Sequence, residues 1–320
     1  MDLRQLKFFL RIAEHGSLTK AAADLAVAQP VLSRQMRDLE RELGVSLLSR
    51  NGRGMVLTEA GRRFLPRARS ITQDAESASE ELRSLRERPS GNVTVAMAPT
   101  AGAMLWVPLL AQVERTLPDV RLQVAEGYSG HVLEWLVLGR ADVGVVYQPQ
   151  EEGGLKHEVL MEERLYLVGA PEAPPFRAAS IAFEELSRLP LILPAMPHAI
   201  RRLLESVATK RRLPLNVELE VNAYPAIKNI MLARRGFTVL PAASMLPEVE
   251  AGRVAIGEIC APALSQRLAL AASAHHAPSA GTRAVCGVIK ALVEELKTSG
   301  RWPARYRAAG AAEAIGSRHR

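Results

Sequence analysis

The feature that most constrains the fold is a helical pattern of apolar residues in the first sixty positions, interrupted twice. The pattern stops at Gly16, restarts behind Ser17, breaks again over residues 26–28 and resumes at Gln29. Serine is a residue type that caps helices, and Pro30 falls in a first helical turn, where proline is tolerated. We therefore predict three short helices joined by tight turns, which is the arrangement of a helix-turn-helix.

The third predicted helix turns polar side chains outward. Its apolar residues recur at helical spacing, which leaves Ser33, Arg34 and Arg37 on the opposite face. Serine and glutamine can read base edges, and arginine pairs with guanine or with phosphate. A basic, glycine-rich segment at residues 50–54 lies between two short apolar runs and predicts a hairpin, or wing, that touches the DNA backbone. The predicted DNA contacts are Ser17, Thr19, Gln29, Pro30, Ser33, Arg34, Arg37, Arg50 and Arg53.

Positive charge is concentrated in the same segment. Residues 1–69 hold 13 Lys and Arg and 7 Asp and Glu, so they account for +6 of the formal net charge of +7. A basic surface of this kind is the electrostatic footprint of a DNA-binding domain. Two alternatives stay open: a plain three-helix bundle with a solvated basic face, and a ligand-binding or enzymatic α/β protein whose basic head binds another protein.

Six segments of this region resemble the N-terminal winged helix-turn-helix of LysR-type transcriptional regulators. They are residues 6–9 (LKFF), 16–22 (GSLTKAA), 29–35 (QPVLSRQ), 39–44 (LERELG), 47–50 (LLSR) and 57–61 (LTEAG). Leu48 and Ser49 depart from the family, which often has an aromatic and a charged residue there. The resemblance implies a sequence-specific regulator of transcription that is not an enzyme.

A long helix is predicted from Thr58 to about residue 88. Its apolar residues alternate by four and three, which is the spacing of a two-helix seam, and Pro66 is expected to bend its start. The alternative is that this stripe packs on the chain's own core. The resemblance implies a linker helix that dimerises and places two heads on a palindromic operator. The predicted dimerisation residues are Phe64, Ala68, Ile71, Ala75, Ala78, Leu82 and Leu85.

Beyond residues 89–91 the composition changes to valine-rich strands that alternate with helices. Strands are expected at residues 92–97, 121–126, 143–147, 164–169, 191–194, 217–221, 237–241 and 268–272. Helices are expected at residues 104–117, 132–138, 200–208, 224–235 and 283–297. This alternation predicts parallel sheet with helices on both faces, in two α/β lobes.

These patterns divide the chain into four predicted parts. Residues 1–58 form the winged helix-turn-helix and residues 59–89 the linker helix. Residues 90–300 form a two-lobed domain, with lobe I at about 92–163 and 268–300 and lobe II at about 164–267. Residues 301–320, rich in Ala, Gly and Arg, are predicted to be a mostly disordered tail.

Polar residues at strand-to-helix junctions predict a binding site between the lobes. Helix N-termini supply N–H groups and partial positive charge, so a carboxylate could be held between Thr100 and Ser129. The alternative is ordinary helix capping. The resemblance implies an effector-binding domain with periplasmic-binding-protein architecture, in which Thr100 and Ser129 match positions that touch a small organic ligand. The predicted effector-binding residues are Ala98, Pro99, Thr100, Ser129, Gly130, Tyr147, Met196, His198, Asn222 and Tyr224.

Enzymatic and metal sites find little support in the sequence. Residues 127–131 lack the second glycine of a nucleophile elbow, and no phosphate-binding or dinucleotide-binding glycine motif occurs. His275 and His276 have no carboxylate or cysteine at metal-ligand spacing, and Cys260 and Cys286 are too few for a disulfide framework. We expect no cofactor, no catalytic residue, no membrane span and a cytoplasmic location.

The expected partners follow from these predictions and from the resemblance. They are double-stranded operator DNA, a small organic effector that an anionic group would suit, and a second copy of the chain. The resemblance further implies a homotetramer and contact with RNA polymerase. Within the family, residues 93–147 and 225–240 look closest to nitrogen-assimilation-control type members.

Overall fold

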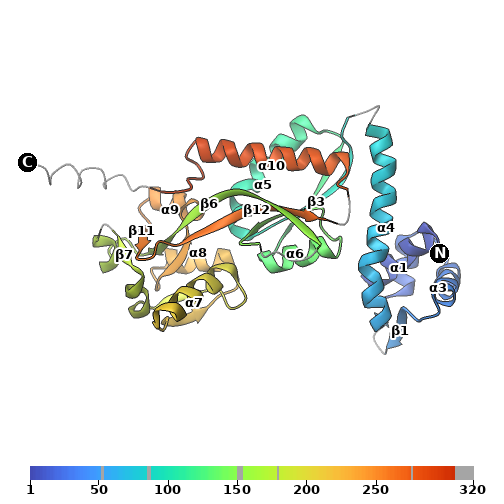
Figure 1. The fold of residues 1–320 in the computed structure, drawn as a ribbon, viewed down its shortest axis with the longest axis horizontal. Coiled ribbons are helices and arrows are strands. Elements are labelled where there is room, and N and C mark those ends of the chain that lie inside the picture. The colour runs from blue at the N-terminus through green and yellow to red at the C-terminus, as the bar shows by residue number, and fades with distance from the viewer. Residues whose placement is uncertain (52–53, 85–87, 150–153, 179, 275–276, 307–320) are drawn as a thin grey trace, which may run out of the picture.

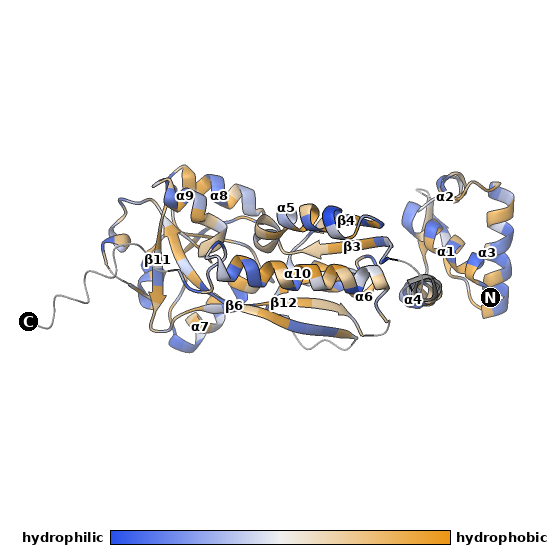
Figure 2. Cartoon of the chain, turned by 90° about the horizontal axis from the view of Figure 1, so that it is seen from above, coloured by the Kyte–Doolittle hydropathy of each residue, from blue (hydrophilic) through white to orange (hydrophobic). Residues whose placement is uncertain are grey.

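The computed structural model describes residues 1–320 except 52–53, 85–87, 150–153, 179, 275–276 and 307–320. A small helical head, one long helix and an elongated α/β domain follow one another along the chain (Figure 1). Seen from above, the long helix stands end-on between the head and the α/β domain (Figure 2). The predicted fold class is confirmed.

Three helices and a hairpin make up the head. They are α1 (Leu3–His15), α2 (Leu18–Asp24), α3 (Gln29–Leu43), β1 (Leu48–Asn51) and β2 (Gly54–Leu57). Two glycines of the predicted motif sit where a side chain is disfavoured. Gly16 ends α1 with a left-handed φ of 59° and accepts a 2.8 Å hydrogen bond from the Met55 N–H, which ties the hairpin to the helix. A Cβ atom on Gly61 would lie 2.0 Å from the Leu47 carbonyl oxygen.

The long helix α4 (Glu59–Ser84) begins as predicted, since the Thr58 hydroxyl accepts a hydrogen bond from the Gly61 N–H at 3.0 Å. Pro66 lies inside it. The predicted dimer seam is wrong at its start. Ala68 is 0% exposed in the head's own core, and the Phe64 ring lies 5.4 Å from the Phe9 ring. The first turns of α4 therefore belong to the core of the head. This agrees with the alternative stated above, that the apolar stripe packs on the chain's own core.

About one turn after Ala68, the residues of the predicted seam become more exposed to solvent. Ile71 is 39% exposed, Ala78 is exposed and Ala75 is half-buried. Leu82 is a position of α4, and Leu85 falls outside the described residues. The second half of the predicted seam is thus still available to a partner helix at Ile71 and Ala78.

Lobe I, the part of the α/β domain next to α4, contains three parallel strands close to the three predicted ranges. They are β3 (Gly91–Met97), β4 (Val120–Glu126) and β5 (Val143–Tyr147), with β3 in the centre. Helices α5 (Pro99–Thr116) and α10 (Ala280–Thr298) pack on one face, against Val93 and Val95. Helix α6 (Ser129–Val137) packs on the other face, against Ala96. Successive side chains of a strand point to opposite faces of the sheet, so Val93 and Val95 face one layer of helices and Ala96 faces the other.

Two long strands connect lobe I with lobe II, and they are antiparallel to each other. They are β6 (Leu155–Gly169) and β12 (Ser265–Ser273). The second half of β6 pairs with β10 (Thr238–Pro241) and β11 (Ala255–Cys260) in lobe II. The sheet is therefore mixed rather than wholly parallel. The sequence prediction began β6 at residue 164, because Lys156, His157 and Glu158 face solvent and show no apolar alternation.

Lobe II has its own core, formed by residues such as Phe183, Leu204 and Met231. A small parallel pair, β8 (Leu191–Leu193) with β9 (Val217–Glu220), carries the helices α7 (Ala199–Arg211) and α8 (Tyr224–Leu232). The remaining elements are η1 (Pro174–Arg177), β7 (Ile181–Ala182), η2 (Phe183–Arg188), η3 (Ala242–Met245) and α9 (Leu246–Glu250). The sequence prediction missed these elements and β11.

The start of the predicted tail is ordered, which corrects the sequence prediction for residues 301–306. Trp302 is 1% exposed, and the Ala304 carbonyl accepts a 2.9 Å hydrogen bond from the Arg164 N–H. The Tyr306 N–H donates to the Tyr166 hydroxyl at 2.8 Å. We call residues 301–306 the C-terminal strap, because they run from the end of α10 in lobe I onto the lobe II half of β6 (Figure 1).

Candidate DNA-binding surface and effector cleft

Helix α3 presents the polar face that the sequence predicts. Pro30, Arg34 and Arg37 are exposed, while Gln29 and Ser33 are half-buried. Arg37 is partly held by its own helix, since its Nε donates to the Ser33 carbonyl oxygen at 3.4 Å. Within the described residues the Arg34 side chain makes no hydrogen bond or ion pair, so it is free to reach a base edge.

The neighbouring elements hold α3 and the wing in place. Ser17 caps α2 by accepting a 3.4 Å hydrogen bond from the Lys20 N–H, and Thr19 is exposed on the same helix. The Glu40 carboxylate accepts hydrogen bonds from the N–H groups of Leu47 and Leu48 at 2.7 and 3.0 Å. This fixes the first wing strand against the end of α3.

The wing carries the other predicted DNA contacts. Arg50 is exposed on β1, while Arg53 falls outside the described residues. Leu48, where this chain departs from the family pattern, is buried in the head core, so its apolar side chain supports the wing from below. The second departing residue, Ser49, is exposed on β1, so the exposed face of the wing differs from the family pattern at that one position.

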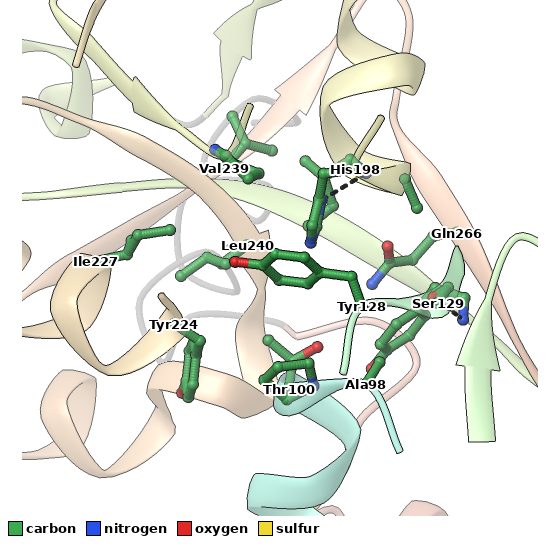
Figure 3. Close-up of a pocket in the computed structure, with 15 residues that line it drawn as sticks. Ala98, Thr100, Tyr128, Ser129, His198, Tyr224, Ile227, Val239, Leu240 and Gln266 are labelled. Atoms are coloured by element: carbon green, nitrogen blue, oxygen red, sulfur yellow. Dashed lines mark hydrogen bonds between the residues drawn. The ribbon is translucent and has the colours of Figure 1, made fainter. Parts of the chain in front are cut away.

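The cleft lies between the lobes, where four helices begin. Helices α5 and α6 of lobe I and α7 and α8 of lobe II all place first-turn or capping residues in its lining (Figure 3). Seven of the ten predicted effector-binding residues line it: Ala98, Pro99, Thr100, Ser129, Tyr147, His198 and Tyr224. The sequence prediction missed the lining residues Tyr128, Pro194, Ala199, Ile200, Ile227, Val239, Leu240 and Gln266.

Three predicted residues lie outside this lining. Gly130 is exposed on α6, and Met196 is 57% exposed. Asn222 is exposed and uses its Oδ1 to accept a 2.9 Å hydrogen bond from the Ala195 N–H. Its role in this structure is to join two loops of lobe II, since its side-chain oxygen is already occupied.

The cleft floor contains buried polar atoms. Gln266 Oε1 makes no hydrogen bond within the described residues, and the buried Tyr147 hydroxyl has none of good geometry there, although it lies beside Thr100 and Glu163. Burial, and after it the nearby Glu163 carboxyl, raises the pKa of Tyr147 well above its usual value. Ser129 Oγ accepts a 2.9 Å hydrogen bond from the Tyr147 N–H, so its own proton stays available to another acceptor. A buried polar atom without a partner costs about 1–3 kcal/mol, which a polar ligand group would recover.

A buried carboxylate lies beneath this floor, where the lobes join. Glu163 on β6 accepts hydrogen bonds from Gln266 Nε2 and from Trp302 Nε1, both at 2.8 Å. Burial raises the pKa of Glu163, and the two donors partly offset that rise. This cluster connects β6, β12 and the C-terminal strap directly below the cleft.

His198 is held neutral at the lobe II side of the cleft. Its Nδ1 accepts a hydrogen bond from the Ile200 N–H at 3.2 Å, which caps α7. Burial, and after it the positive charge of Arg202, lowers the pKa of His198 to about 4. In the unfolded chain the imidazole titrates near its usual value of about 6.5. Between these two values the unfolded chain binds more protons, so His198 makes the folded protein less stable as the pH falls.

We therefore expect His198→Asn to reduce the loss of stability on acidification. Asparagine keeps an acceptor for the Ile200 N–H but cannot be protonated. The measurement is the free energy of unfolding by urea at pH 7 and pH 4.5, for both proteins. His15, which is exposed and ion-paired with Asp24 when protonated, provides the matched control as His15→Asn. An equal loss in the original and His198→Asn proteins contradicts the expectation.

A helix-turn-helix head, a long helix and a two-lobed domain with a cleft define a DNA-binding regulator with an effector-binding domain. Residues 3–62 match the family model described as "Bacterial regulatory helix-turn-helix protein, lysR family". Residues 86–294 match the model described as "LysR substrate binding domain". The chain belongs to the LysR-type transcriptional regulators, and it is a transcription regulator rather than an enzyme.

Known proteins are similar to this chain over nearly its whole length. The "Nitrogen assimilation regulatory protein nac" of Klebsiella aerogenes is 32% identical over 92% of this chain and 95% of its own. Its namesake from Escherichia coli K12 is 31% identical, over 84% and 88%. Both agree with the finer resemblance that the sequence suggested.

Solved structures support the fold. A full-length OxyR variant from Pseudomonas aeruginosa has a TM-score of 0.77 at 23% identity and covers 92% of this chain and 95% of its own. Full-length CbnR in complex with its target DNA has a TM-score of 0.61 at 24% identity, over 92% and 99%. Among the described helices, none has the length and hydrophobicity that a membrane span requires.

Proposed function

We propose that the chain is a homodimeric, cytoplasmic regulator that reads an operator with α3 and responds to a small organic effector in the cleft. The observation that carries the effector assignment is the convergence of four helix starts on buried polar groups between the lobes, among them Gln266 Oε1, which has no partner within the described residues. Ser17, Gln29, Ser33 and Arg34 are the proposed contacts in the major groove, and Arg50 is a proposed contact to the backbone.

The cleft favours an effector with an apolar body and one anionic or strongly polar group. None of its lining residues carries a formal charge, and most of them are apolar or aromatic. A carboxylate would meet the N-terminal N–H groups of α5 and α6 together with the Thr100 and Ser129 hydroxyls. The helix starts thus supply the positive potential that a lysine or arginine would supply elsewhere.

The exposed part of the α4 seam supports the proposed dimer. We expect Ile71→Asp to shift the protein from dimer to monomer, because a charge at a helix-pair seam loses its hydration without gaining a partner. Analytical ultracentrifugation at micromolar concentration measures the change. Val45→Asp is the matched control, since Val45 is an apolar residue of the head that is 48% exposed and lies outside the α4 seam. A dimer that persists in Ile71→Asp removes this seam from the proposal.

The test of the whole proposal is selection of genomic DNA fragments by the purified protein at two salt concentrations. We expect enrichment of a spaced inverted repeat. The logarithm of the binding constant should fall linearly with the logarithm of the salt concentration, with a slope of about −0.9 for each phosphate that the protein neutralises. A head that binds another protein through apolar contacts would show no such enrichment and little salt dependence. Genes next to the enriched sites then indicate effectors to test, promoters at which to test contact with RNA polymerase, and DNA on which to look for tetramers.

A further inference from the structure

The phenol ring of Tyr128 occupies the middle of the cleft. Tyr128 is the residue before α6 in lobe I, and its ring extends between Thr100 and His198 toward Leu240 (Figure 3). The Tyr128 and His198 rings meet edge to face, with centroids 4.6 Å apart and planes at 87°. The contact joins a residue of lobe I to a residue of lobe II across the cleft.

The ring leaves too little space for an organic ligand. The remaining cavity measures about 30 Å³. A cavity of this size holds a water molecule or two, whereas benzene fits an engineered cavity of about 150 Å³. An organic effector can therefore enter the cleft only if its lining moves, and the Tyr128 ring is the side chain that fills its middle (Figure 3).

Packing, and not hydrogen bonding, holds the ring in place. Within the described residues the Tyr128 hydroxyl makes no hydrogen bond, and the ring packs on His198 and, at 6.3 Å, on His131. The side chain is half-buried, and burial raises its pKa. Because the Tyr128 side chain makes no capping hydrogen bond to α6, its rotation to another staggered rotamer costs only the packing contacts of the ring.

We propose that Tyr128 is an internal occupant of the effector site, whose ring closes the empty cleft and is displaced when an effector binds. This inference rests on the proposed function, since it takes the cleft to be the effector site. A ring that fills the site in about nine molecules of ten lowers the apparent affinity of an effector about tenfold. Tyr128 thus sets a size and affinity threshold for ligands, and its contact with His198 links the lobes when no ligand is present.

The experiment uses phenol as the probe and the full chain with Tyr128→Ala. Removing the ring leaves a space of its own shape, so we expect saturable phenol binding by isothermal titration, about tenfold tighter than to the original protein. Tyr128→Phe keeps the ring and should bind phenol no better than the original. Tyr306→Ala removes an equally large side chain outside the cleft and should not create a phenol site.

The outcomes are distinct. A folded Tyr128→Ala protein, checked by circular dichroism, that does not bind phenol overturns the proposal, whether the cleft collapses or was never shaped by the ring. Equal binding by Tyr306→Ala also overturns it. Phenol binding by Tyr128→Ala that is abolished when Leu240→Trp refills the cleft supports it. If phenol binds in the cleft but does not change the affinity for the selected DNA, the inference about Tyr128 stands and the proposed regulatory function of the cleft is contradicted.

Discussion

Arg34→Ala should weaken binding to a selected operator by about 1–3 kcal/mol for each half-site, and by about twice that for a symmetric dimer. The guanidinium is exposed on α3 and is free of partners within the described residues, so its donors are available to a guanine edge. Alanine keeps the helix, because it is the best helix former. The measurement is a fluorescence anisotropy titration on the operator and on a scrambled duplex of equal length.

Arg41→Ala is the matched control for this prediction. Arg41 lies near the end of the same helix and is exposed, but it is ion-paired with Asp38 at 2.9 Å. A surface ion pair of this kind contributes about 0–1 kcal/mol, so we expect little change in operator affinity. If Arg34→Ala weakens binding to operator and scrambled duplexes equally, Arg34 contacts phosphate and does not read a base.

Trp302→Ala should destabilise the two-lobed domain by about 3–5 kcal/mol, which is the usual cost of removing a buried tryptophan. Trp302 is 1% exposed in the core of lobe I, and its indole N–H is one of the two donors to the buried Glu163 carboxylate. For a domain of this size the loss corresponds to a fall in Tm of roughly 10 °C. Differential scanning calorimetry of the full chain provides the measurement.

Trp106→Ala separates burial from hydrogen bonding in this prediction. The Trp106 indole also donates to a carboxylate, Glu126 Oε1 at 2.7 Å, but it does so at the surface. We expect its removal to cost only about 1–2 kcal/mol, since the ring is half-buried and water can replace the hydrogen bond. Similar losses in both variants would show that the C-terminal strap is only loosely attached.

Elements with a clear local pattern could be predicted from the sequence. The break at Gly16, the cap at Ser17 and the strand at residues 143–147 all depend on neighbours within a few positions. The four helix starts of the cleft were visible for the same reason, because strand ends and capping residues follow one another along the chain. Of the ten residues predicted by that reasoning, seven line the cleft, which has fifteen lining residues in all.

What escaped prediction depends on contacts between distant segments. Trp302 and Glu163 are 139 positions apart, and the Ala, Gly and Arg around Trp302 gave no sign of burial. Gln266 lies within β12, far along the chain from any helix N-terminus, so the search for polar residues at helix starts did not find it. The position of the Tyr128 ring depends on how the two lobes meet, which no local pattern encodes. Ala68 was assigned to the dimer seam on its spacing, but a small residue at that spacing fits a core position of the same chain too.

The C-terminal strap crosses from one lobe to the other. Helix α10 packs on lobe I, yet the last described residue, Tyr306, hydrogen-bonds to Tyr166 in the lobe II half of β6, so residues 301–306 span the joint between the lobes. A fluorescent dye or a fused protein attached directly after Tyr306 would be carried by lobe II. Paired with a dye on α10, it would report the angle between the lobes in solution and so make the protein usable as a biosensor scaffold.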